Sequence, residues 1–397
     1  MKAKGISRAP SRGGCWPTPQ QELLLQAALL QGENSLNAWH SWKKTTDIEV
    51  DKLEFSSFRL LPQVYRNLCN QGLNGDLLIE KLKGIYRLHW YKNQRLFHHL
   101  AFLLGSFHAV GIKTMILKGV ALSLQYYRDY GLCGMEDFDV LVPTRKVLEA
   151  IALLKGLGWT TRGIALEDLT EDYRFVRHSQ PFKDTSDCEL DLHWHLLPGR
   201  PAADADDDFW GGAIEIKINN VSTYALNHTD QLLHVCIHGS VWNDVPHLRW
   251  VADAMTILKV VESEIDWARF LVQAQKRRLT IPLKETLSYL REKFDAPVSA
   301  EVLKALQNIT VSKREHLEYQ LTTTPPTFFS VLIKFWLINE RLTEGVGFWK
   351  RLRQFSKFLP YWNMPPLWKM PFYAIFRGVR KLRRMILWYK SQFFKRF

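Results

Sequence analysis

The stretch "MEDFDVLV", residues 135–142, places two carboxylates, Asp137 and Asp139, in an apolar run with the pattern of a buried strand. Because side chains alternate along a strand, both carboxylates project from one face. Two carboxylates at one spot repel each other, and burial makes each charge costly. A divalent cation removes this conflict, since Mg²⁺ takes oxygen ligands from one or two carboxylates. The alternative is a strand that ends in ordinary acidic residues.

Bulk composition favours a globular intracellular protein. A chain of 397 residues with 46% hydrophobic and 13% aromatic content can form two or three domains with proper cores. The five cysteines are scattered and form no CxxC pair, so neither a disulfide framework nor a cysteine zinc site is indicated. The N-terminus lacks the continuous apolar core of a signal peptide, and "FFSVLIKFWLI" is too short for a membrane span. We expect a cytoplasmic protein, with a peripheral place at the inner face of the membrane as the alternative.

The positive charge is concentrated at the C-terminal end. Residues 350–397 contain 13 Lys and Arg and no Asp or Glu, which accounts for the whole net charge of +13. From Phe372 onward, aromatic and aliphatic residues recur at helical spacing, which predicts a basic amphipathic helix. Such a helix could bind an anionic membrane surface, a partner protein or this protein's own body. Nucleic acid is the less favoured partner.

Periodicity divides the chain into five parts. Residues 1–17 form a flexible leader, and residues 18–110 have helical periods. Residues 111–226 alternate between short apolar runs closed by glycine and helical segments, which is an α/β pattern. Residues 227–320 are again helical. A Thr- and Pro-rich linker opens residues 321–397, which end in the basic aromatic tail.

Two neighbouring motifs extend the acidic pair into a phosphate site. The segment "ILKG" ends a strand and begins a helix, so Lys118 and Gly119 lie at a turn whose N–H groups attract the phosphates of a nucleotide. The later strand "CELDLHWHLL" offers Glu189 and Asp191 on one face. A third carboxylate allows a second metal ion, and two metals can stabilise both the attacking and the leaving oxygen of a phosphate-transfer reaction.

The segments "LKGVALSLQYYRDYGLCGMEDFDVLVP", "GLGW", "ELDLHWHL" and "DQLLHVCIHG" followed by "HLRWVADAMTIL" and "IDW" resemble the uncharacterised nucleotidyltransferase family, a branch of the DNA polymerase beta-like superfamily. The resemblance covers residues 18–300. It implies an α+β fold, with a small mixed sheet flanked by helices and helical regions on either side in sequence. It also implies that Asp137 and Asp139 bind Mg²⁺, with Mn²⁺ as the alternative, and that Asp191 is the later carboxylate.

The same resemblance implies an activity. The superfamily transfers a nucleoside monophosphate from an NTP, such as ATP, to a hydroxyl-bearing acceptor and releases pyrophosphate. Two positions depart from the pattern. Val120 follows Gly119 where the superfamily has Ser or Gly, and Cys133 stands where nearer members usually carry Arg. We expect Lys118 to substitute for the missing hydroxyl. Two alternatives are a catalytically weakened scaffold on this fold, and a membrane or RNA adaptor acting through the tail.

Two histidine pairs are further candidates. His234 and His238 are four residues apart on a predicted helix, but no Glu lies between them and no third ligand is evident, so packing against the sheet is favoured over zinc binding. His193 and His195 are placed on a face that alternates with Asp191. Packing or hydrogen bonding is the favoured role for them, and orientation of the acceptor is the alternative.

Overall fold

The computed structural model describes residues 13–46, 53–73, 77–200, 202–362, 364–370 and 372. The chain forms two compact units. The first contains the chain up to Gly163, Ser179–Leu196 and Ala203–Pro325, and the second contains Ile164–His178, Leu197–Ala202 and the chain from Pro326. The second unit therefore begins its longest segment within the Thr- and Pro-rich linker.

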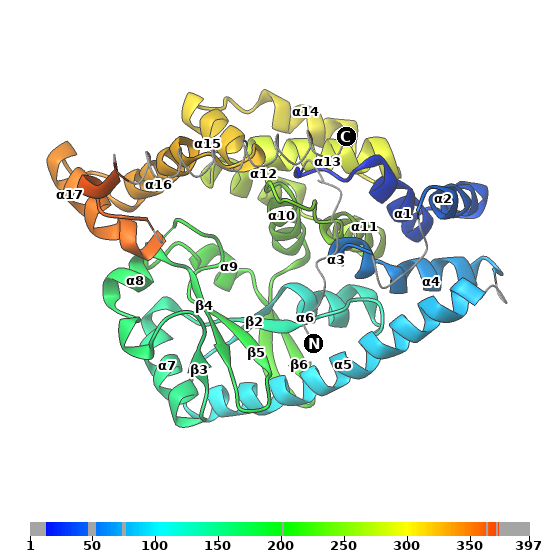
Figure 1. Ribbon diagram of the computed structural model, residues 1–397, viewed down its shortest axis with the longest axis horizontal. Coiled ribbons are helices and arrows are strands. Elements are labelled where there is room, and N and C mark those ends of the chain that lie inside the picture. Colours follow the sequence, from blue (N-terminus) through cyan, green and yellow to red (C-terminus); the bar gives the residue numbers. More distant parts are fainter. Residues whose placement is uncertain are drawn as a thin grey trace, which may run out of the picture. The chain divides into compact units, whose positions relative to one another are not determined.

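The first unit contains a seven-stranded mixed sheet (Figure 1). In spatial order its strands are β3 (Thr160–Thr161), β4 (Ser179–Lys183), β5 (Glu189–His193), β2 (Asp137–Leu141), β1 (Met115–Leu117), β7 (Val221–Ala225) and β6 (Ile214–Ile218). The pairs β2–β5 and β1–β7 are parallel, and the other neighbours are antiparallel. With helices on both sides in sequence, this sheet confirms the predicted α+β fold.

The helices of the first unit come before, between and after its strands in sequence. Those before the sheet are α1 (Pro19–Leu29), α2 (Gly32–Thr45), α3 (Phe55–Phe58), α4 (Leu61–Asn70) and α5 (Leu77–Ala109). Those between strands are α6 (Lys118–Leu122), which continues as a π-helical turn at Ser123–Tyr127, α7 (Val147–Gly156) and α9 (Asp207–Gly211). Those after the sheet are α10 (His228–Gly239), α11 (Arg249–Val260), α12 (Trp267–Lys276), α13 (Thr280–Phe294), α14 (Ala300–Asn308) and α15 (Lys313–Thr323).

Helix α5 is the longest element and supports the sheet. Its buried side chains recur every three or four residues, as at Leu96, Leu100 and Leu104, which gives one apolar stripe. The helix contacts β2, β6, β7 and α7. It is followed by Gly111 with φ of +70°, a left-handed conformation that glycine adopts without strain.

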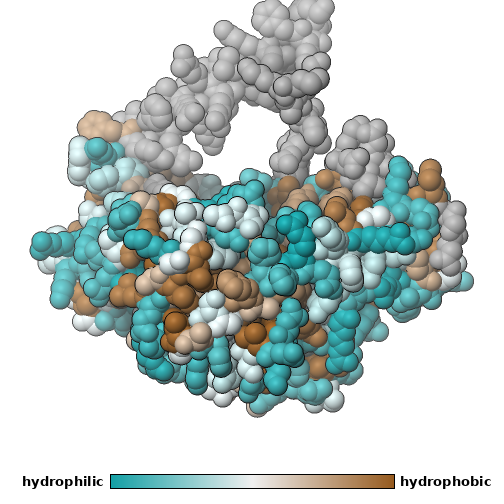
Figure 2. Space-filling model, turned by 90° about the horizontal axis from the view of Figure 1, so that it is seen from below, coloured by the Kyte–Doolittle hydropathy of each residue, from teal (hydrophilic) through white to brown (hydrophobic). Residues whose placement is uncertain are grey.

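The opposite side of α5 faces solvent. Figure 2 views the molecule from the side on which α5 runs in Figure 1, and shows brown hydrophobic residues interspersed with teal hydrophilic ones. The large apolar side chains exposed on this helix are Leu77, Leu88, Trp90, Tyr91 and Phe102. Exposed apolar residues interrupted by polar ones are common on globular proteins.

The second unit has its own apolar core. Its helices are α8 (Glu171–Val176), α16 (Phe328–Leu342) and α17 (Phe348–Phe358). Phe335 stacks on Trp362 with ring centroids 4.6 Å apart, and Phe355 and Phe358 are buried beside them. Among the residues that the structure describes, no helix combines the length and apolar composition that a membrane span requires.

Both ends of the chain bear on the sequence predictions. Of the predicted leader, residues 13–17 are described: Gly14 exchanges backbone hydrogen bonds with Asn243, and Cys15 is buried. The basic amphipathic helix predicted from Phe372 onward lies outside the described residues, apart from Phe372 itself.

Candidate functional site

The predicted acidic residues meet on two adjacent strands. Strands β2 and β5 are parallel neighbours, with Asp139 in register with Asp191 and Asp137 in register with Glu189. Because paired residues on neighbouring strands project to the same side, Asp139 and Asp191 face one spot. Asp139 is buried at 5% exposure, whereas Asp137, at the beginning of β2, is exposed. The acidic cluster therefore extends from the interior to the surface.

Two cationic side chains compensate the buried carboxylates. The Lys118 ammonium donates to Asp139 Oδ1 at 2.5 Å. His193 Nε2 lies 3.1 Å from the same oxygen and 3.0 Å from Asp191 Oδ2. Ser179 Oγ also donates to Asp191 Oδ2, at 3.2 Å. The other oxygen, Asp191 Oδ1, is buried and has no hydrogen-bond partner in the described part of the chain.

The protonation of this group follows from its contacts. Burial alone would raise the pKa of Asp139, but Lys118 and His193 hold that pKa well below its usual range. Burial alone would lower the pKa of His193, yet its hydrogen bonds to Asp139 and Asp191 outweigh burial and raise the pKa to about 9. At neutral pH the carboxylates are ionised, and His193 and Lys118 carry positive charge.

The position of His193 corrects one sequence prediction. The imidazole was expected on a face that alternates with Asp191, which is wrong, because residues two apart in a strand share a face. His193 instead bridges Asp139 and Asp191, and it is almost fully buried. His195 is bound elsewhere, with Nδ1 3.0 Å from Asp206 Oδ2. The predicted hydrogen-bonding role therefore applies to both histidines, with different partners.

The Lys118–Gly119 turn lies directly after β1, as predicted. Lys118 has a φ of +48°, an uncommon left-handed conformation for a residue with a side chain. Gly119 is packed closely: a Cβ there would lie 2.7 Å from Met135 Cγ and 2.8 Å from the Arg249 guanidinium. The glycine thus admits protein groups, and one of them is an arginine that the sequence interpretation did not consider.

Asn93 of α5 fixes the loop before the acidic pair, and sequence reasoning missed it. Its Nδ2 donates to the carbonyls of Tyr130 and Cys133, at 2.5 and 2.8 Å, while its Oδ1 accepts from the Met135 amide at 3.3 Å. Asn93 is completely buried. A single asparagine within the apolar stripe of a helix was the available signal, since buried polar groups need partners.

The residues at the cluster fit a divalent metal ion. One ligand atom from each of Asp139, Asp191 and His193 lies within 4.8 Å of the others. Because His193 is protonated, the two carboxylates are the available ligands, and a metal ion would take the place of the proton that His193 shares with them. Asp191 Oδ1, which has no hydrogen-bond partner among the described residues, offers a further acceptor to a cation. Hard oxygen ligands of this kind suit Mg²⁺ or Mn²⁺.

Two other histidine-containing groups bear on the metal assignment, and one of them, His234 and His238, is close enough to the cluster for Lys118 and Asp139 to influence its pKa values. His99, Asp184 and Cys188 also bring one ligand atom each within 4.8 Å of one another. A thiol and an imidazole suit zinc better than magnesium. His234 and His238 contact each other edge to face with ring centroids 4.6 Å apart, the packing contact expected from their spacing. Magnesium binding is therefore a specific test of the acidic cluster.

Carboxylates held in register by two adjacent strands, beside a lysine at a strand-to-helix turn, are what metal-assisted phosphate transfer requires. The chain belongs to the uncharacterised nucleotidyltransferase family, whose sequence profile matches residues 56–295. The match confirms the resemblance seen in the motifs and supports nucleotidyl transfer as the general activity. No curated protein matches the chain.

Proposed function

We propose that the protein is a Mg²⁺-dependent nucleotidyltransferase that moves a nucleoside monophosphate from an NTP to a hydroxyl-bearing acceptor. The observation that supports this most directly is the register of Asp139 with Asp191, which brings one buried and one half-buried carboxylate to one spot beside Lys118. Asp191 Oδ1, which has no hydrogen-bond partner among the described residues, is a further oxygen that a cation could use.

Asp139 and Asp191 would hold the metal inside the cluster, and Asp137 would hold it from the exposed end of β2. A bound Mg²⁺ or Mn²⁺ supplies charge neutralisation at the phosphates and lowers the pKa of a coordinated hydroxyl. His193 keeps the carboxylates of Asp139 and Asp191 aligned through its shared contacts at 3.1 and 3.0 Å. This alignment fixes the ligand oxygens before substrate arrives.

Groups of this chain take up the proton of the acceptor hydroxyl and stabilise the negative charge of the phosphates. Asp191 accepts the proton of the acceptor hydroxyl as its oxygen forms a bond with the α-phosphorus. The bond between the α-phosphorus and the bridging oxygen breaks, and pyrophosphate leaves with the electron pair. Lys118 and the Gly119 amide place positive charge beside the phosphates. Val120 offers no hydroxyl for this task.

The test uses each of the four NTPs labelled at the α-phosphate. The purified protein is incubated with Mg²⁺ and a mixture of sugars, small metabolites, tRNA and protein as candidate acceptors. We expect one class of acceptor to become labelled with release of pyrophosphate, and EDTA to abolish the transfer. If no NTP yields a labelled product and no NTP shifts the melting temperature in a Mg²⁺-dependent way, the non-catalytic scaffold replaces this proposal.

A further inference from the structure

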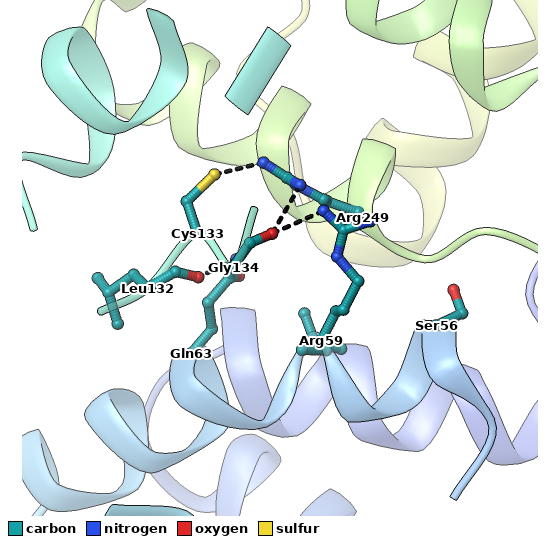
Figure 3. Close-up of a pocket in the computed structure, with 8 residues that line it drawn as sticks. Ser56, Arg59, Gln63, Leu132, Cys133, Gly134 and Arg249 are labelled. Atoms are coloured by element: carbon teal, nitrogen blue, oxygen red, sulfur yellow. Dashed lines mark hydrogen bonds between the residues drawn. The ribbon is translucent and has the colours of Figure 1, made fainter. Parts of the chain in front are cut away.

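Two guanidinium groups meet over the loop that leads to the acidic pair (Figure 3). Arg59 comes from the end of α3, and Arg249 is the first residue of α11. Both donate to one backbone oxygen, Gly134 O, from Arg59 Nη2 at 2.6 Å and from Arg249 Nη1 at 3.0 Å. Arg249 Nη2 also donates to the thiol of Cys133. A single carbonyl is thus shared by two like charges.

The charge of this pair is only partly compensated. Asp253 lies 3.3 Å from Arg249 Nε, and it also accepts the hydroxyl of Tyr127 at 2.6 Å. Arg59 forms no ion pair within the described ranges, and its Nε is buried without a hydrogen-bond partner. One excess positive charge therefore stays in a partly buried pocket, where it attracts an anion more strongly than at an open surface.

Neighbouring groups respond to this charge. Burial and the charge of Arg59 lower the pKa of His89 to about 4. Burial and the charge of Arg249 lower the pKa of Arg59 to about 10, which still leaves it protonated at neutral pH. His89 is therefore neutral at neutral pH and adds no third positive charge to the pocket.

The pocket adjoins the proposed phosphate turn. The Arg249 guanidinium lies against Gly119, where an added Cβ would be 2.8 Å from it. Gly134 precedes Asp137 by three residues, so the two backbones are at most roughly 11 Å apart. Lys118, which contacts Asp139, lies at the same turn. The two arginines therefore add two cations to Lys118 for a phosphate chain that extends from the acidic cluster.

We propose that Arg59 and Arg249 bind the terminal phosphates of the nucleotide substrate. This inference rests on the proposed function, since it assigns the part of the NTP that becomes pyrophosphate. Guanidinium groups bind phosphate oxygens in a bidentate manner and more strongly than they bind a neutral carbonyl. The Gly134 carbonyl is the acceptor they hold in the absence of substrate, and phosphate oxygens replace it.

The test measures binding rather than turnover. Calorimetry with the full-length protein, Mg²⁺ and inorganic tripolyphosphate as the probe compares the natural protein with Arg59→Gln. Because one charge-assisted contact is removed, we expect binding to weaken about 10- to 100-fold. Affinity for AMP, which lacks the terminal phosphates, should not change. Arg59→Lys keeps the positive charge but loses the planar guanidinium that binds in a bidentate manner. Its affinity should therefore lie between that of the natural protein and that of Arg59→Gln.

A matched control distinguishes the loss of a specific phosphate contact from the loss of one positive charge. Arg87→Gln removes one positive charge from an exposed position of α5 away from the pocket. The inference is overturned if Arg59→Gln binds tripolyphosphate as tightly as the natural protein, if Arg87→Gln loses as much affinity, or if the natural protein does not bind the probe. If Arg59→Gln does not fold, the comparison of Arg59→Lys with Arg87→Gln decides. Tripolyphosphate binding through Arg59 without transfer from any NTP would support this site while rejecting the proposed function.

Discussion

Replacing Asp139 by Asn tests the acidic cluster with the smallest change in shape. The substitution removes the negative charge at the oxygen that Lys118 and His193 share, and it leaves Asp191 in place. Strand β2 and its register with β5 should persist, because the side chain keeps its size. The expected effect on turnover is therefore much larger than the effect on folding.

The magnitudes follow from the contacts of Asp139. It accepts two charge-assisted hydrogen bonds, each worth about 1.5–3 kcal/mol. The Lys118 side chain is 34% exposed, so its share is reduced by solvent, and an amide oxygen can keep one of the two bonds. We expect a loss of about 2–3 kcal/mol in the free energy of unfolding. A metal ligand contributes several kcal/mol to the transition state, so turnover should fall about 1,000-fold.

The assay combines pyrophosphate release with a thermal melt in the presence and absence of Mg²⁺ and the active NTP. Asp187→Asn is the matched control, since Asp187 lies in the turn before β5 with its side chain 85% exposed, and its φ of +65° suits Asn. The natural protein and this control should gain melting temperature with Mg²⁺ and NTP, whereas Asp139→Asn should not. Turnover within about tenfold of the natural rate in Asp139→Asn would refute the metal-ligand assignment.

Three further predictions concern stability, measured by urea unfolding. His89 is buried, and its pKa is lowered to about 4. The folded state therefore resists protonation, whereas the unfolded state binds a proton near pH 6.5. The free energy of unfolding should be highest above pH 6.5 and should fall by about 3 kcal/mol as the pH drops toward 4. His89→Gln should flatten this acid-side slope, and an unchanged slope would contradict the reasoning. Gly131→Ala places a Cβ 2.1 Å from the ring of Tyr86 and should lower the free energy of unfolding by about 1–3 kcal/mol. Gly84→Ala, on the open surface of α5, should raise it by about 0.5–1 kcal/mol. Equal effects of the two substitutions would reject the steric argument. Phe138→Ala empties a fully buried position and should cost about 3–5 kcal/mol, and a loss below about 1 kcal/mol would show that the core does not depend on it.

Much of the sheet was predictable because its strands alternate or are uniformly apolar. Residues 137–141 and 189–193 form strands where the pattern indicated them, and 214–225 form a hairpin around Asn219 and Asn220, both in left-handed conformations. Strand β4 was missed, since Ser179–Lys183 contains a proline and has no alternation. The parallel pairing of β2 with β5 could not be derived, because the choice of neighbour depends on packing between distant segments.

Part of the candidate site could also be predicted from the alternation of side chains along a strand. A period of two was enough to place Asp137 and Asp139 together on one face, and it should also have placed His193 with Asp191. The salt bridge of Lys118 with Asp139 was not evident, because the turn and the strand are paired only in the folded sheet. Arg59 and Arg249 come from helices about 190 residues apart in sequence, and no local pattern marks such a pair.

The hydrogen bonds of Asn93 limit how this protein can move. Because one buried side chain anchors three backbone groups between Tyr130 and Met135, the loop cannot swing as a lid of its own. Helix α5 and the loop therefore form one rigid piece, and any closure around a substrate has to come from other elements. Asn93 therefore makes the loop before the acidic pair a rigid part of the candidate site.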